Sequence, residues 1–75
     1  MTLEEFVEAF AAEFEETPVE LFTPETKYKE FEEWGSLLAL SIISMVDEQM
    51  DKVLTGADIR STETIKDLYD LLNAK

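Results

Sequence analysis

The sequence contains neither cysteine nor histidine. Without cysteine, the chain can form no disulfide and has no thiolate to act as a nucleophile or a metal ligand. Without histidine, it lacks the side chain that most often serves as a general base or binds a metal near neutral pH. Carboxylates remain, but no pair stands in a recognisable catalytic arrangement, and no Asp-x-Asp-x-Asp-Gly calcium loop occurs. We therefore expect a protein that is not an enzyme and binds no metal.

Basic residues are also scarce, because 6 Lys and Arg stand against 18 Asp and Glu, giving a formal net charge of -12. Binding to nucleic acid or to an anionic membrane needs clustered positive charge, so we expect neither as a partner. The natural partner is a protein with a basic surface, which electrostatic steering brings in faster. Charge repulsion between copies favours a monomer. Repulsion within the chain predicts a fold that added salt or magnesium stabilises.

The sequence has no apolar run long enough to span a bilayer, and its first residues lack the basic flank of a signal peptide. A cytoplasmic location is therefore the expectation. The length of 75 residues predicts a single domain over residues 1–75. The apolar fraction of 45% is too high for a disordered acidic tail.

Helical periodicity dominates the pattern of apolar residues. Thr2 and Glu5 have the spacing of a capping box, and the stripe that follows them predicts a first helix that ends at Thr17-Pro18. The stripe consists of Leu3, Phe6, Val7, Phe10, Ala11 and Phe14. From Pro18 to Gly35 the signals are mixed, and they indicate a long ordered loop with one helical turn near Pro24. Its anchors are the aromatic residues Phe22, Tyr28, Phe31 and Trp34.

A second helix is predicted from about Ser36 to Met50, with Ser36 as its N-cap. The segment 55–58 predicts the start of a brief third helix, and Thr64 begins a capping-box pattern for a fourth. We therefore expect an all-α fold, namely a four-helix bundle with a long loop between the first and second helices and a short third helix.

At about 100° per residue, the second helix divides into two arcs. The apolar arc, expected to face the core, contains Leu38, Ala39, Ile42, Ile43, Met45, Val46 and Met50. The polar arc contains Ser41, Ser44, Asp47, Glu48 and Asp51. Two large apolar residues, Leu37 and Leu40, lie on or beside the polar arc within one turn of Ser36. Such a pair fits a docking surface for a partner with an apolar dimple and a basic rim, although single exposed leucines are also common without a function.

Two interpretations of Ser36 fit its position before an apolar helix. A serine there is usually a simple cap. The same position also suits a phosphate ester, because the amides of the first turn and the positive end of the helix dipole favour negative charge. Position alone does not separate the two interpretations.

The segment from Trp34 to Ile43 resembles the attachment region of acyl carrier proteins, in which Asp-Ser-Leu opens a long helix. The order of the predicted elements is similar to that family over essentially the whole chain. Two residues depart from the family pattern. Gly35 stands where aspartate is usual, and Trp34 is an unusually bulky neighbour. These departures leave two pathways open, namely the main fatty-acid synthase and a dedicated pathway with its own transferase or ligase.

The resemblance implies that a phosphopantetheinyl transferase attaches 4′-phosphopantetheine from coenzyme A to Ser36. The thiol of this arm would carry acyl groups as thioesters between acyl-transfer, ligase or synthase enzymes with basic docking surfaces, as in fatty-acid or polyketide-type biosynthesis. The docking residues that it implies are Leu37, Leu40, Asp47, Glu48 and Asp51. Candidate acyl-pocket residues are Ile42, Val46 and Leu54. Two alternatives stay open, namely an aminoacyl or peptidyl carrier domain of the same fold and an acidic helical interaction module without an arm.

Overall fold

The computed structural model describes all residues from 1 to 75, and it contains helices and loops only. The four α-helices are α1 (Leu3–Ala12), α2 (Ser36–Met50), α3 (Gly56–Arg60) and α4 (Ile65–Asn73). Two single-turn 3-10 helices, η1 (Val19–Leu21) and η2 (Tyr28–Glu30), lie in the loop between α1 and α2. The predicted all-α fold, with its long loop and short third helix, is confirmed.

Three of the four helices begin with a capping box, at the places that the sequence predicts. In α1, the Thr2 hydroxyl oxygen accepts from the Glu5 amide at 3.1 Å, and the Glu5 carboxylate accepts from the Thr2 amide at 2.8 Å. Reciprocal pairs of this kind satisfy two amides that a helix start leaves without partners. The same arrangement begins the two C-terminal helices, with the pairs Thr55 and Asp58, and Thr64 and Asp67.

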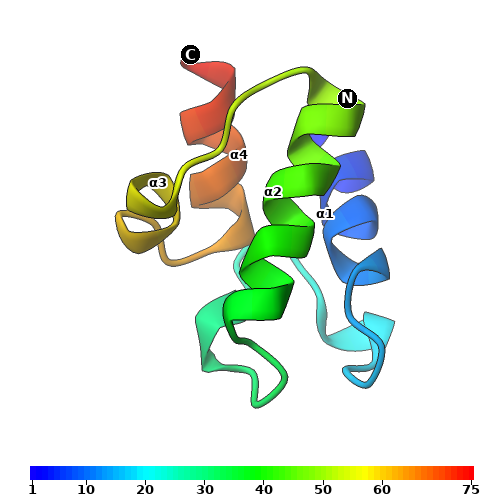
Figure 1. Ribbon diagram of the computed structural model, residues 1–75. Coiled ribbons are helices and arrows are strands. Elements are labelled where there is room, and N and C mark those ends of the chain that lie inside the picture. Colours follow the sequence, from blue (N-terminus) through cyan, green and yellow to red (C-terminus); the bar gives the residue numbers. More distant parts are fainter.

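The helices pack around a single apolar core. In Figure 1, α1 and α2 lie side by side and run in opposite directions. Helix α1 also contacts α4, and α3 contacts α4. The end of α1, the long loop and the start of α2 share one end of the bundle, at the bottom of Figure 1. The largest side chains of the core that are completely buried are Phe6, Phe10, Tyr28, Ile42, Val46, Ile65, Leu68 and Leu72.

The loop between α1 and α2 is held by its aromatic side chains, as predicted. Phe22 and Tyr28 are buried, while Phe31 and Trp34 are half-buried against the core. The Tyr28 ring lies 5.0 Å from the ring of Phe10 and 5.0 Å from that of Trp34, edge-on to both. Such edge-to-face pairs are a preferred geometry for aromatic rings.

Hydrogen bonds attach the same loop to α4 and to the turn before it. The carbonyl of Thr26 accepts from the Ile65 amide at 3.2 Å, and the carbonyl of Pro24 accepts from the Lys66 amide at 2.9 Å. The Tyr28 hydroxyl pairs with the buried hydroxyl of Thr62 at 3.0 Å. The loop is thus ordered by contacts with residues more than 30 positions away in the sequence.

Two local predictions for this part of the chain are wrong. Helix α1 ends at Ala12 and does not continue to Thr17. The reason is that the amides of residues 15–17 donate to the Glu33 carboxylate and not to helical carbonyls four residues back. No helical turn starts at Pro24, which instead lies in a tight turn closed by the Thr26 amide and the Thr23 carbonyl at 3.1 Å.

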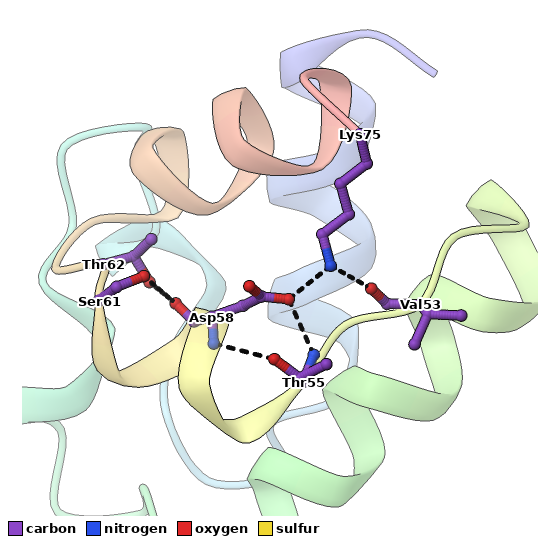
Figure 2. Close-up of polar contacts among 6 residues, drawn as sticks. All are labelled: Val53, Thr55, Asp58, Ser61, Thr62 and Lys75. Carbon is purple, nitrogen blue, oxygen red and sulfur yellow. Dashed lines mark hydrogen bonds and ion pairs between the residues drawn. The ribbon is translucent and has the colours of Figure 1, made fainter.

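Contacts around Asp58 join the C-terminal end of α4 to α3 and to the loop before it (Figure 2). The Lys75 ammonium donates to the Asp58 carboxylate and to the Val53 carbonyl, both at 2.6 Å. The same carboxylate accepts from the Thr55 amide at 3.0 Å, and the Asp58 carbonyl accepts from the Ser61 hydroxyl at 2.9 Å. The bond from Lys75, together with those from Thr55, lowers the pKa of Asp58.

Candidate functional site

Ser36 is the first residue of α2, and it is exposed. The N-cap is Gly35, whose carbonyl accepts from the Ala39 amide at 3.0 Å. The prediction that Ser36 caps the helix is therefore wrong. The chain enters α2 through Gly35 in a fully extended conformation (φ -177°, ψ -173°), so that Ser36 already has the place of the first helical residue. No side chain caps this helix.

The first turn of α2 presents backbone amides that have no partner in the protein. Neither a carbonyl nor a side chain accepts from the amides of Ser36, Leu37 and Leu38. Unpaired amides at the positive end of a helix dipole favour an anion. Access is open on the N-terminal side, because a Cβ atom added at Gly35 would meet nothing within 4 Å. A modifying enzyme can therefore reach the Ser36 hydroxyl, and negative charge attached there would lie beside free donors.

The two leucines that the sequence places on the polar side of α2 are exposed, as predicted. Leu37 is 83% exposed and Leu40 is 61% exposed. Both line one shallow hollow of about 350 Å³, together with Ser44 and the predicted docking residue Glu48. The opposite wall includes Glu13, which follows the end of α1. Leu37, Leu40 and Glu48 thus share one surface, and a carboxylate that was not predicted borders it.

The other two predicted docking residues lie apart from this hollow. Asp47 is exposed and borders a different hollow, which it shares with Ile43 and Leu54. Asp51 is exposed beyond the end of α2, where it is the C-cap in a left-handed conformation with φ 53°. Aspartate tolerates that conformation better than most residues. The docking role of all five residues stays a prediction.

Ser36 lies between two hollows of different character. The hollow toward α1, of about 470 Å³, is lined by the carboxylates of Glu13, Glu15 and Glu33 as well as by Ser36. The hollow between α2 and α3, of about 380 Å³, has a single charged side chain, that of Arg60. The rest of its wall consists of Trp34, Gly35, Ser36, Ala39, Ile43, Gly56 and Ile59.

The three predicted acyl-pocket residues belong to the packed core. Ile42 and Val46 are 0% exposed, and Leu54 is 3% exposed. None of them lines either hollow that borders Ser36. A role in holding an acyl chain stays a prediction for these residues, and it requires the core to open. The apolar side chains that do border Ser36 on the α3 side include Trp34 and Ile59, which the helical arcs of α2 do not reveal.

Glu33 fixes the backbone that precedes the serine. Its carboxylate accepts from the amides of Glu15, Glu16 and Thr17 at 2.8, 3.1 and 2.9 Å, and from the Thr17 hydroxyl at 2.8 Å. Desolvation raises the pKa of this carboxyl, but the four hydrogen bonds together outweigh it, and the pKa of Glu33 is lowered. No sequence pattern pointed to this contact, which joins residues 16 to 18 positions apart.

Comparison with models of protein families, with curated proteins and with solved structures gave no match for this chain. None of the four helices combines the length and the apolar character needed to cross a bilayer. No group of three or more acidic side chains converges as the ligands of a metal ion would. A functional assignment therefore depends on the geometry around Ser36.

Proposed function

We propose that the chain is an acyl carrier protein in which Ser36 bears 4′-phosphopantetheine. The observation that supports this most directly is an exposed serine hydroxyl that does not cap the long helix it opens. Capping is the ordinary reason for a serine at a helix start, and here Gly35 occupies the cap position. The resemblance of the segment 34–43 to a carrier attachment region supplies the alternative reason.

The surroundings of Ser36 fit the chemistry of that group. Its hydroxyl oxygen would form the bond to the phosphorus of coenzyme A that carries pantetheine, and the hydroxyl proton would pass to the transferase. The pyrophosphate bond would break at the same phosphorus, and adenosine 3′,5′-bisphosphate would leave with the bridging oxygen. The free amides of Ser36, Leu37 and Leu38 would then stabilise the negative charge of the phosphodiester. When attached, the group supplies the thiol that a chain without cysteine lacks, and this thiol holds acyl cargo.

Partner enzymes would bind the α2 surface that Leu37, Leu40 and Glu48 share. The net charge of -12 attracts a basic surface over a distance, which raises the rate of association. Large apolar side chains that become buried on binding supply much of the affinity at interfaces of this kind. Asp47 and Asp51 extend the acidic surface toward the end of α2, where we expect them to affect the association rate more than the affinity.

The test is the intact mass of the chain after incubation with coenzyme A, magnesium and a phosphopantetheinyl transferase. Wild-type protein should gain the mass of one 4′-phosphopantetheine group, and the Ser36→Ala variant should gain none. Ser61→Ala is the matched control, because Ser61 is an exposed serine that lines neither the hollows beside Ser36 nor the docking hollow, and its loss should not affect modification. Wild-type protein that stays unmodified by transferases of several pathways would contradict the proposal and favour the acidic interaction module.

A further inference from the structure

The two hollows that border Ser36 differ in charge. The hollow toward α1 contains three carboxylates and no cation. The hollow between α2 and α3 contains the guanidinium of Arg60 and no carboxylate. A negatively charged group on the Ser36 hydroxyl is therefore repelled on one side and attracted on the other.

Arg60 is one of the four cations of this protein that have no ion-pair partner, although acidic residues outnumber basic ones by 18 to 6. Among these four, only Arg60 lines a hollow that borders Ser36. The two ion pairs of the structure join Lys66 to Asp70 and Lys75 to Asp58. The Arg60 side chain turns back over the first turn of α3, since its Nη1 atom lies 3.4 Å from the place of a Cβ atom on Gly56. Gly56 lines the same hollow as Ser36, so this places the guanidinium at the wall of that hollow.

We propose that Arg60 binds the phosphodiester of the group on Ser36 and thereby directs the arm into the groove between α2 and α3. This inference rests on the proposed function of Ser36. A guanidinium suits the role because its planar set of donors matches the oxygens of a phosphate. The apolar wall formed by Trp34, Ile43 and Ile59 offers contacts for the pantetheine that follows the phosphate. Arg60 is thus a positioning residue, and it would keep the thiol on the α3 side of the docking surface.

The test uses the modified full-length protein and two variants with the same change in net charge. Arg60→Gln removes the proposed phosphate contact. Lys27→Gln is the matched control, because Lys27 is also an exposed cation without an ion pair but borders a different hollow. Phosphorus NMR of the attached group should show a changed phosphodiester resonance in Arg60→Gln and an unchanged one in Lys27→Gln. Arg60→Lys should recover the wild-type resonance only in part, because a lysine keeps the charge but lacks the planar donors.

Trp34 gives a second measurement, because it is the only tryptophan of the chain and lines the proposed groove. Attachment of the group should change the fluorescence of wild-type protein and of Lys27→Gln, and most of this change should be lost in Arg60→Gln. In wild-type protein alone, raising the ionic strength to about 1 M, where the screening length is about 3 Å, should move the phosphorus resonance toward that of Arg60→Gln.

The possible results separate this inference from the proposed function. If wild-type protein accepts no group, both proposals fail. If the group is attached and neither the phosphorus resonance nor the Trp34 signal depends on Arg60, the inference is overturned while the carrier function stands. If a transferase does not modify Arg60→Gln, the inference is tested by the salt titration of the modified wild-type protein. A phosphorus resonance that does not change with ionic strength then overturns the inference.

Discussion

Two neighbouring leucines of α2 allow an effect on partner docking to be distinguished from an effect on the stability of the fold. Leu37 is 83% exposed and Leu38 is 8% exposed. Replacing either leucine by alanine removes the same atoms and changes helix propensity by the same small amount. A difference between Leu37→Ala and Leu38→Ala therefore reports the environment of each side chain and not the chemistry of the change.

The exposed fractions of the two side chains determine how much stability each substitution should cost. Truncation of a buried leucine costs about 2–4 kcal/mol, so Leu38→Ala should lower the free energy of unfolding by that amount. In a domain of this size, 1 kcal/mol corresponds to about 4–8 °C, which predicts a fall in Tm of about 8–32 °C. Complete burial of a leucine contributes about 1.5–3 kcal/mol, and only a small part of Leu37 is covered. Leu37→Ala should therefore change stability by less than about 0.5 kcal/mol.

The assay compares thermal unfolding, followed by circular dichroism, with the rate of 4′-phosphopantetheine addition at low carrier concentration. Loss of an apolar contact near the centre of an interface costs about 1–2 kcal/mol, so Leu37→Ala should be modified about tenfold more slowly. Leu38→Ala should be modified at nearly the wild-type rate at temperatures where it is folded. Equal losses of stability in the two variants, or an unchanged rate for Leu37→Ala, would refute the reasoning.

Four further predictions follow from the structure. Glu33→Gln should lower the Tm at neutral pH. Because the pKa of Glu33 is lowered in the folded state, the stability it contributes is present above the unfolded pKa and is lost as the pH falls through the lowered folded pKa. In a pH series of melting curves, the difference from wild type should therefore begin to narrow near the ordinary glutamate pKa of about 4 and close at lower pH. Gly35→Asp should raise the free energy of unfolding in denaturant by about a few tenths of a kcal/mol, since Gly35 is an extended N-cap with open space around it. Because aspartate is usual at this position in acyl carrier proteins, the same variant should also be modified faster by a transferase of fatty-acid synthesis. Tyr28→Phe removes the buried hydrogen bond to Thr62 and should cost about 1 kcal/mol in the same assay. Added salt or magnesium should raise the Tm of wild-type protein by screening its net charge of -12, and a Tm independent of both would contradict this.

The parts of the fold that could be predicted depend on local patterns. The three capping boxes involve residues three positions apart, so their motifs are visible in the sequence. The exposure of Leu37 and Leu40 and the burial of Leu38 and Ile42 follow from helical periodicity alone. The predicted extent of α2, from about Ser36 to Met50, is also correct, although its N-cap is Gly35 and not Ser36.

The parts that could not be predicted depend on contacts between distant residues. The early end of α1 results from the carboxylate of Glu33, which binds backbone amides 16 to 18 positions away. Arg60 and Ser36 line the same hollow because of the way α3 packs beside α2. A helix of five residues is too short for its apolar pattern to predict that orientation. The periodicity of α2 also does not distinguish a core residue such as Ile42 from a residue that lines a groove, because that distinction depends on the neighbouring helix.

Fragmentation mass spectrometry of the chain recovered from a host with an active carrier pathway tests the central claim most directly. This measurement identifies which hydroxyl carries the phosphodiester among Ser36, Ser41, Ser44 and Ser61, the four serines of the chain. We predict a single 4′-phosphopantetheine group, located on Ser36. A group on any other residue, or a chain without one when carriers of the same host are fully modified, would contradict the claim.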